Sequence, residues 1–152
     1  MQTQFTIGAF GILTDDHNRV LLCLRNDINL WNLPGGGVES GEAPWEAVIR
    51  EVKEETGYDT AVERVIGIYS KPEIDQLVFL YQCKILSGEM QVNSEAREIK
   101  YFSQSEIPAN IPAKHIERIN DYFLKSLEVI QRKQFGKSTV ELIKEGKHSL
   151  SK

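Results

Sequence analysis

The stretch GGVESGEAPWEAVIREVKEETGY, residues 36–58, holds the most informative pattern in the chain. Within it, residues 43–56 predict an amphipathic helix, because apolar side chains recur at helical spacing, at Trp45, Val48, Ile49 and Val52. Gly57 follows as the C-terminal cap of that helix. At the start of the stretch, the glycines of Pro34-Gly35-Gly36-Gly37 permit backbone conformations that are closed to other residues. The pattern therefore predicts a glycine-rich turn that leads into a helix.

Acidic side chains gather on one surface of this predicted helix. Glu51 and Glu55 are four residues apart and Glu54 is three from Glu51, so their carboxylates project from neighbouring parts of the helix. Such crowding costs free energy unless something positive lies among the charges, and hard oxygen ligands select Mg²⁺ or Mn²⁺ over softer metals. Arg50 is placed to orient and partly neutralise the cluster. The carboxylates alone also fit a solvated helix face, since helices rich in Glu are common.

The rest of the chain interleaves strands with helices. We expect strands over residues 4–14, 20–24, 60–69, 76–86 and 99–102, and a second amphipathic helix over residues 111–131. The first two strands should form a hairpin, because residues 15–18, Asp-Asp-His-Asn, have the composition of a turn. This order of elements predicts an α/β (α+β) fold with a mixed β-sheet, which an α/β/α sandwich would satisfy.

Composition restricts the class of protein. With 152 residues, 41% hydrophobic and 26% charged, the chain has the length of one domain and the composition of a globular protein. No apolar run is long enough to span a membrane, and the N-terminus lacks the pattern of a signal peptide. Cys23 and Cys83 each lie inside an apolar run, as expected of buried free thiols in a reducing compartment. We therefore expect a cytoplasmic protein.

The net charge of −4 is unevenly distributed. Residues 132–152 carry six Lys or Arg against two acids, which leaves a charge of −8 on residues 1–131. An acidic body disfavours nucleic-acid backbone as the main partner, because that affinity depends on basic side chains, and it suits a cation site better. We interpret residues 1–131 as the functional domain and residues 132–152 as a basic C-terminal extension, either helical or flexible.

The spacing of residues 36–58 resembles the signature of the Nudix hydrolase family. That signature is Gly, five residues, Glu, seven residues, Arg-Glu, an apolar residue, any residue, Glu-Glu, any residue, Gly and an apolar residue. Every specified polar and glycine position is met, from Gly36 through Glu42 and Arg50 to Gly57. Tyr58 is a minor departure from the signature, since it is aromatic where an aliphatic residue is usual. The resemblance in element order covers roughly residues 4–131 and implies a Nudix-type α/β/α sandwich, with a Nudix hydrolase domain over residues 1–131.

The resemblance implies a hydrolase that cleaves the diphosphate linkage of a nucleoside diphosphate joined to another group, X. Family members bind Mg²⁺ or Mn²⁺ for the attack of water, so we expect Mg²⁺ as the cofactor, with Mn²⁺ able to substitute. The matching positions imply that the metal ligands are Glu51, Glu54, Glu55 and the backbone carbonyl of Gly35. Catalysis should therefore depend on the metal.

The resemblance also implies roles for other acidic residues. Glu42 would pair with Arg50 and act as an orienting residue beside the cluster. The general base varies within the family, and Glu54 is a candidate inside the motif. Glu95 or Glu98, just before the strand predicted at residues 99–102, could supply a ligand or the base from a separate loop. An ordinary surface position also explains both of these loop acids.

The substrate is less constrained than the chemistry. Pro72 lies 15 residues after Gly57, similar to a proline placement associated with ADP-ribose pyrophosphatases, and a turn proline is the alternative interpretation. We name Arg25 and Pro72 as candidate substrate-binding residues. We favour ADP-ribose or another nucleoside diphosphate sugar over nucleoside triphosphates, including oxidised ones.

Two further alternatives stay open. One is an RNA 5′-end pyrophosphohydrolase whose basic tail holds the RNA, and the other is a binding module that has kept the fold but lost turnover. The expected partner is a small nucleotide substrate, without a membrane and without nucleic acid as the main ligand. Members of the family are often dimers, so a homodimer is one expected assembly, although no stretch of sequence identifies an interface.

Overall fold

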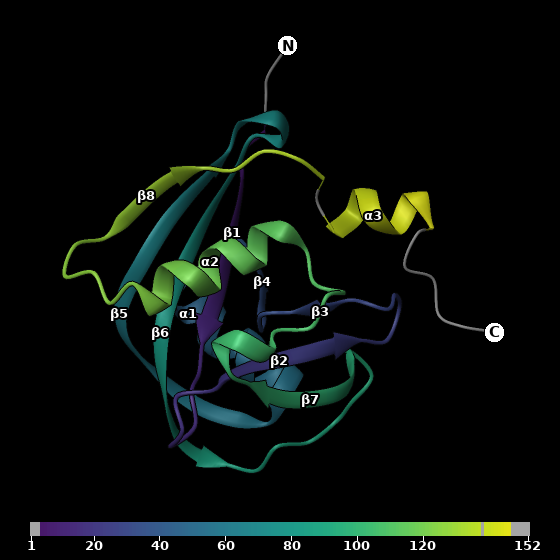
Figure 1. Cartoon of the computed structure of the whole chain (residues 1–152). Coiled ribbons are helices and arrows are strands. Elements are labelled where there is room, and N and C mark those ends of the chain that lie inside the picture. Colours follow the sequence, from purple (N-terminus) through teal and green to yellow (C-terminus); the bar gives the residue numbers. More distant parts are fainter. Residues whose placement is uncertain (1–3, 138, 147–152) are drawn as a thin grey trace.

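The strands form two sheets in the computed structural model, which describes residues 4–137 and 139–146 (Figure 1). The larger sheet has the order β4-β1-β6-β5-β8, made of Gly35–Gly37, Thr6–Ile12, Gln76–Gly88, Tyr58–Lys71 and Ile130–Lys133. This sheet is mixed, because β1 pairs in parallel with β6 and β5 in parallel with β8, whereas β4 and β1, and β5 and β6, are antiparallel. The smaller, antiparallel sheet has the order β3-β2-β7, made of Trp31–Asn32, Val20–Arg25 and Ala96–Phe102.

Strand β2 shows how helices come to cover both sides of the strands. Its side chains alternate between the two faces, and all but the last are buried. Leu22 and Leu24 join a hydrophobic cluster that contains helix α2 (Ala113–Phe123), whereas Leu21 and Cys23 join a second cluster that contains helix α1 (Pro44–Thr56). The strands therefore lie between two helices, and the expected α/β/α arrangement with a mixed sheet is confirmed, with a second sheet in addition.

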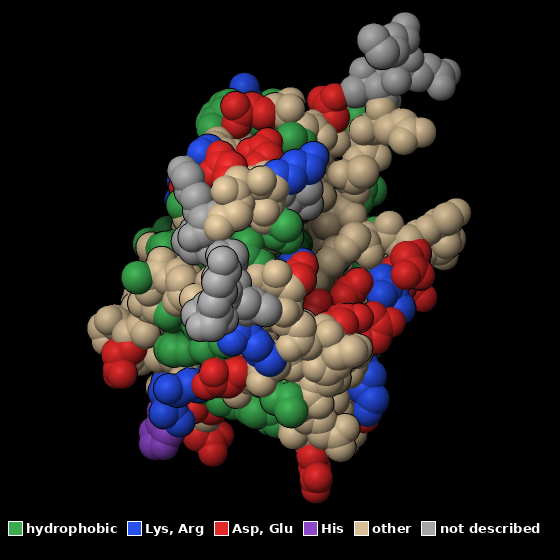
Figure 2. Space-filling view, turned by 90° about the vertical axis from the view of Figure 1, so that its right-hand side faces the viewer, with side chains coloured by type: hydrophobic (Ala, Val, Ile, Leu, Met, Phe, Trp, Pro, Cys, Tyr) green, Lys and Arg blue, Asp and Glu red, His purple; other side chains and the backbone are tan. Residues whose placement is uncertain are grey.

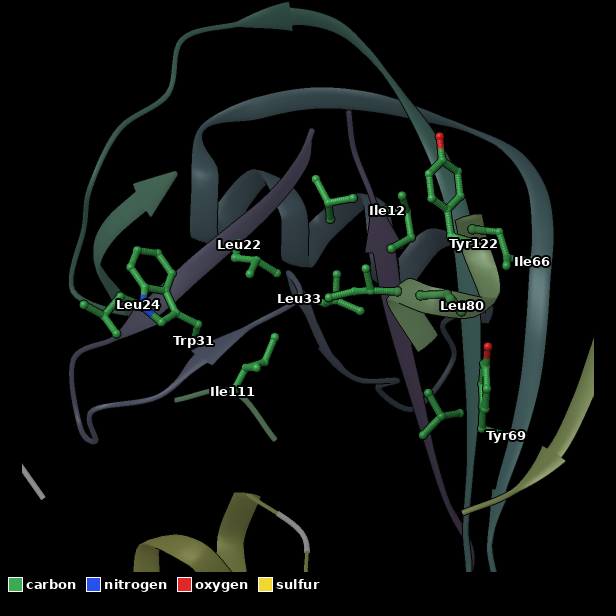
Figure 3. Close-up of a cluster of buried hydrophobic side chains, with 13 residues drawn as sticks. Ile12, Leu22, Leu24, Trp31, Leu33, Ile66, Tyr69, Leu80, Ile111 and Tyr122 are labelled. Atoms are coloured by element: carbon green, nitrogen blue, oxygen red, sulfur yellow. The ribbon is translucent and has the colours of Figure 1, made fainter. Parts of the chain in front are cut away.

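The cluster around α2 joins the two sheets (Figure 3). Figure 3 shows its side chains extending from strands of both sheets and from α2 toward a shared interior. Leu33, in the segment between β3 and β4, lies inside this cluster and is only 1% exposed. Burial of this apolar surface is the main force that holds the sheets together. It also anchors the segment that leads into the glycine-rich strand β4.

The predicted hairpin between the first two strands forms only next to its turn. Thr14 bridges Val20, the Leu21 N–H donates to the Leu13 oxygen at 2.9 Å and the Asp15 N–H donates to the Arg19 oxygen at 3.1 Å, but β1 and β2 themselves belong to different sheets. Beyond the turn, β1 pairs with β4 and β6, whereas β2 pairs with β3 and β7, so the two strands separate into different sheets.

The predicted helix over residues 111–131 is too long. Helix α2 ends at Phe123, Lys125 has a positive φ of 53°, and residues 130–133 form strand β8 beside β5. Leu127, which helical spacing placed on the buried face, is fully exposed. A left-handed residue stops a helix, and the free edge of β5 offers the following residues backbone partners. Strand β8 thus crosses the boundary between residues 131 and 132 at which we divided the chain.

Three short helical elements complete the fold within the described residues. Short 3₁₀ turns cover Pro72–Ile74 (η1) and Gln104–Glu106 (η2), and Thr139–Glu145 form helix α3. Trp45 was expected on the buried face of α1 but is 57% exposed, because that face is formed by Ala47, Val48, Val52 and Thr56. Cys23 and Cys83 are buried and free, as expected. None of the helices within the described residues has the length and apolar character needed to cross a membrane.

Candidate functional site

Glycines let strand β4 lie directly against the acidic helix α1. Gly35 has a φ of 150°, and a Cβ atom there would come within 2.3 Å of the Ala9 carbonyl oxygen. A Cβ atom on Gly36 would lie 2.6 Å from Oε1 of Glu51. Gly35 therefore requires glycine for its conformation, and a side chain at Gly36 would displace the Glu51 carboxylate from its present position. The glycine-rich segment predicted from the sequence is strand β4, and its backbone contacts the Glu51 carboxylate.

Arg50 is the centre of an ion-pair network that lies beside strand β4. Its Nε donates to Oε2 of Glu42 at 2.7 Å and its Nη2 donates to Oε1 of the same carboxylate at 3.0 Å. Its Nη1 lies 3.1 Å from Oε1 of Glu51 and 3.3 Å from Oε2 of Glu54. The paired hydrogen bonds with Glu42 raise the pKa of Arg50 and lower that of Glu42, so both groups stay charged. The structure thus brings together the orienting pair expected from the sequence.

Four carboxylates gather beside this network. Glu51, Glu54 and Glu95 each offer an oxygen atom, and these atoms lie within 4.8 Å of one another. Glu55 also lies against strand β4, where its Oε2 accepts a hydrogen bond from the Gly35 N–H at 3.1 Å. Burial and, after it, the negative charge of Glu51 raise the pKa of Glu55. The group therefore holds more negative charge than Arg50 neutralises.

These residues fit a hard divalent cation. Carboxylate oxygens and a backbone carbonyl are the donors that Mg²⁺ and Mn²⁺ prefer, and a cation among them would remove the repulsion that raises the pKa of Glu55. Arg50 contacts both Glu51 and Glu54, and the Glu51 side chain is the more enclosed, at 14% exposed against 45% for Glu54. The site therefore combines an enclosed oxygen donor with a more exposed one.

Asn93, which the sequence did not single out, positions Glu95 beside the other carboxylates. Asn93 donates from Nδ2 to the backbone oxygens of Glu54 at 3.0 Å and Glu55 at 2.7 Å. Its Oδ1 accepts from the backbone N–H of Glu95 at 2.7 Å and of Ala96 at 3.1 Å. Asn93 therefore ties the end of α1 to the loop that carries Glu95. A single Asn in a polar loop gives no signal of this role in the sequence.

Glu98 lies elsewhere. It is an exposed residue on β7, opposite Leu24 of β2, and it is not part of the group formed by Glu51, Glu54 and Glu95. Of the two loop acids considered from the sequence, the structure brings only Glu95 to the other carboxylates.

A cavity of about 500 Å³ opens beside the carboxylates. Gly35, Glu55 and Glu95 line one part of it, and Phe10 and Leu33 give it an apolar wall. Helix α3 contributes to the lining through Thr139, Glu141 and Lys144. Figure 2 shows this face of the molecule, where acidic side chains crowd around a basic one at the edge of a hollow. The cavity thus joins the candidate metal site to the C-terminal segment.

The two candidate substrate-binding residues differ in position. Arg25 lines the cavity, and its guanidinium donates to both carboxylate oxygens of Asp27, at 2.7 and 2.6 Å. Pro72 is exposed and does not line the cavity, although its neighbours Lys71 and Ile74 do. Pro72 therefore lies outside the cavity lining, at the start of the turn that connects Lys71 with Ile74.

The cavity also contains buried cations that the sequence analysis did not identify. They are Lys71 at the end of β5, and Lys114 and Arg118 on successive turns of α2. His115, between the last two, accepts a hydrogen bond at Nδ1 from the Leu33 N–H at 3.1 Å. The available signal in the sequence for this cluster was that Lys114 and Arg118 are four residues apart and so share a face of the helix. The apolar residues around them made that signal hard to recognise.

Comparison with known proteins relates this arrangement to one family. The family model of the NUDIX domain matches residues 4–124. An "ADP-ribose pyrophosphatase" of Methanocaldococcus jannaschii is 34% identical over 124 residues, covering 76% of this chain and 72% of that protein. A Bacillus subtilis (strain 168) protein named "Putative 8-oxo-dGTP diphosphatase" is 36% identical over 119 residues, covering 78% of this chain and 80% of that protein.

Solved structures agree with this relation. The crystal structure of an ADP-ribose pyrophosphatase from Streptococcus suis 89-1591 superimposes with a TM-score of 0.67 at 26% identity, covering 85% of this chain and 98% of that one. A NUDIX hydrolase from Nitrosomonas europaea superimposes with a TM-score of 0.76 at 23% identity, covering 88% of this chain and 80% of that one, which supports the fold alone.

Proposed function

The chain belongs to the Nudix family and is a hydrolase of nucleotide pyrophosphates, and on this premise we propose that it uses Mg²⁺ to cleave ADP-ribose or another nucleoside diphosphate sugar. The observation that carries the proposal is the single cavity that joins the carboxylates to the basic and apolar walls beyond them. Its volume of about 500 Å³ is in the range of small-molecule sites. Such a cavity can hold a diphosphate at the carboxylates together with a group attached to it.

Glu51, Glu54 and Glu55, with the backbone carbonyl of Gly35, would hold the metal ion. A bound divalent cation supplies positive charge that offsets the negative oxygens of a diphosphate and stabilises the leaving phosphate. Arg50 keeps Glu51 and Glu54 in place through the contacts of Nη1, while Glu42 keeps Arg50 in place through two hydrogen bonds. The chain thereby arranges the donors before a ligand arrives, which reduces the cost of binding.

A carboxylate of the same group would accept the proton of the attacking water. Glu54 and Glu95 are the two candidates, because both are exposed and both belong to the carboxylate group. We favour Glu95, since Glu54 also contacts Arg50 and is a candidate ligand. Removal of this proton would contribute about 10²–10⁴-fold to the rate.

A second candidate function is hydrolysis of nucleoside triphosphates, including oxidised ones. It is favoured by the similarity to the Bacillus subtilis protein, whose name gives an 8-oxo-dGTP activity. The two candidates differ in products, because a nucleoside diphosphate sugar yields a nucleoside monophosphate and a sugar phosphate, whereas a triphosphate yields a monophosphate and pyrophosphate.

A product screen separates these functions. The purified chain is incubated with ADP-ribose, other nucleoside diphosphate sugars, dinucleotides and nucleoside triphosphates, in Mg²⁺, in Mn²⁺ and in EDTA. We expect AMP from ADP-ribose, or the corresponding monophosphate from another sugar nucleotide, only when metal is present. Pyrophosphate release from triphosphates alone would support the second candidate. Silence across the panel from folded protein would contradict both.

A further inference from the structure

Three buried cations stand together in the cavity outside the carboxylate group. Lys71 is 8% exposed, Lys114 is 8% exposed and Arg118 is 1% exposed. Lys71 closes strand β5, and the other two lie four residues apart on α2, so one sheet and one helix present them to the same space. Burying three positive charges is costly unless each has a partner.

The hydrogen-bond partners of the Lys71 and Arg118 side chains among the described residues are neutral. Lys71 donates to Oε1 of Gln76 at 2.7 Å, and Arg118 donates from Nε and Nη2 to Oε1 of Gln134 at 3.2 and 2.9 Å. Nη1 of Arg118 is buried and has no hydrogen-bond partner among the described residues. Within those residues no carboxylate forms an ion pair with any of the three cations.

Burial is the largest influence on the protonation of all three cations. Burial, followed by the charges of Lys114 and Arg118, lowers the pKa of Lys71 to about 8. Burial lowers the pKa of Arg118 to about 10, and burial followed by the charge of Arg118 lowers the pKa of Lys114. Three carboxylates act in the opposite direction, Glu141 on Lys71 and Lys114, Glu73 on Lys114 and Glu117 on Arg118, but more weakly than burial. These carboxylates therefore offset the effect of burial only in part.

Aromatic rings fix the guanidinium in position. The Cζ atom of Arg118 lies 5.2 Å from the ring centroid of Phe10 and 5.6 Å from that of Tyr69. These contacts and the two hydrogen bonds to Gln134 leave Arg118 little freedom to swing toward solvent. A rigid, buried guanidinium with one unused edge suits a planar or tetrahedral oxyanion.

We propose that Lys71, Lys114 and Arg118 form an anion subsite, and that the preferred substrate carries a phosphate monoester or carboxylate in addition to the diphosphate that is cleaved. This inference rests on the proposed function, because it assigns the far end of the same cavity to the same ligand. The anion is carried either by the group X or by the nucleoside. In both cases a substrate with only a diphosphate leaves the subsite without its partner.

Binding of inorganic phosphate in EDTA tests the subsite without turnover. Without metal, the carboxylate group repels phosphate, so binding reports on the cations. Calorimetric titration of the full chain is compared for the wild type, Lys71→Gln, Lys114→Gln and the control Lys84→Gln, which removes an exposed charge on β6 outside the cavity. We expect the first two variants to bind about tenfold more weakly, consistent with one lost charge-assisted contact, and the control to match the wild type. Equal affinity in all four proteins, or equal weakening in the control, would overturn the subsite.

Two substrate pairs then identify which part of the ligand carries the anion. UDP-glucose and UDP-glucuronate differ by a carboxylate on X, and ADP-ribose and its 2′-phosphate differ by a phosphate on the nucleoside. We expect the anionic member of one pair to have a kcat/KM higher by about tenfold, and Lys114→Gln to remove that preference through KM. Equal kcat/KM within both pairs would contradict the inferred substrate class. If no nucleotide is cleaved but phosphate binding depends on Lys71 and Lys114, the proposed function fails and the subsite stands.

Discussion

At the scale of single residues, the candidate site depends on how Arg50 is shared among acids. One guanidinium contacts the carboxylates of Glu42, Glu51 and Glu54 and the backbone oxygen of Gly37. Only the planar, five-donor guanidinium can make this set of contacts at once, so lysine would not replace it. The motif therefore specifies a geometry as well as a charge.

Substitution of Glu54 tests the carboxylate group. We expect Glu54→Gln to lower kcat by about two orders of magnitude or more, because the amide keeps the shape but loses the charge needed to hold metal or accept a proton. The matched control is Glu98→Gln, an exposed acid outside the group, which should keep near-normal activity. Steady-state kinetics in saturating Mg²⁺, with circular dichroism to confirm folding, give the comparison. A folded Glu54→Gln protein with normal turnover would contradict the assignment.

His115 makes stability depend on pH. Burial, with the nearby charges of Arg118, Lys71, Arg25 and Lys114, lowers the pKa of His115 well below the ordinary value of 6.5. Below pH 6.5 the unfolded chain takes up a proton that the folded chain refuses, so the free energy of unfolding falls as pH falls and is fully restored above that value. The loss approaches about 1.4 kcal/mol per pH unit.

Urea denaturation at pH 7 and pH 5 measures this effect. The loss of stability on acidification should be smaller in His115→Gln than in the wild type, because the titrating group is gone. His17→Gln, which removes an exposed imidazole, should lose as much stability as the wild type. Identical pH dependence in all three proteins would show that His115 protonates freely in the folded state.

At the scale of elements, the site forms where α1, β4 and the loop before β7 meet. The first two come from one continuous motif, but Glu95 arrives from a loop about forty residues further along the sequence. The Asn93 side chain makes two hydrogen bonds to the last turn of α1 and two to the backbone N–H groups of Glu95 and Ala96. The position of Glu95 is therefore a property of the packed elements, with Asn93 as the positioning residue.

Removal of the Asn93 side chain should loosen Glu95 without touching the motif. We expect Asn93→Ala to lower kcat by about tenfold and to weaken Mn²⁺ binding, because two hydrogen bonds to each partner segment are lost. Gln91→Ala is the control, since Gln91 lies in the same loop and its side chain makes none of these bonds. Turnover and Mn²⁺ titration are measured at a temperature where both variants are folded. If Asn93→Ala behaves like Gln91→Ala, the loop does not depend on Asn93.

At the scale of the whole molecule, the C-terminal segment belongs partly to the core and partly to the cavity. Arg132 of β8 pairs with the buried carboxylate of Asp121, and the buried Gln134 accepts both hydrogen bonds from Arg118. Further along, α3 contributes lining residues to the cavity. The C-terminal segment therefore contributes to the core through Arg132 and Gln134, and separately to the cavity lining through α3.

Two truncations should separate them. Ending the chain after residue 131 removes partners of Asp121 and Arg118, so we expect the free energy of unfolding to fall by about 2 kcal/mol or more. Ending it after residue 136 keeps those contacts and removes α3, so the free energy of unfolding should change little while KM for the substrate changes. Chemical denaturation and steady-state kinetics measure the two quantities. Equal stability of the two truncated chains would show that residues 132–136 contribute nothing to the stability of the core.

The part of this protein that the sequence determines by itself is local. Gly36, Arg50, Glu51 and Glu54 meet because helical spacing places residues three and four apart on one surface and because a glycine-rich turn precedes the helix. Those relations hold within one segment, so the acidic helix and its capping glycine were predictable from the residues, whereas the pairing of Arg50 with Glu42 was expected from the resemblance to the Nudix signature. The general architecture followed from the alternation of strand and helix patterns.

Tertiary structure alone decided what depends on distant partners. β1 and β2 separate beyond their turn because each pairs with strands from distant parts of the chain, and residues 130–133 form a strand because the edge of β5 offers them backbone partners. The choice of Glu95 over Glu98 and the assembly of Lys71 with Arg118 also join segments far apart in the chain. The physical reason is that burial and backbone hydrogen bonding are satisfied over the whole molecule, and periodicity within one segment carries no information about which partner satisfies them.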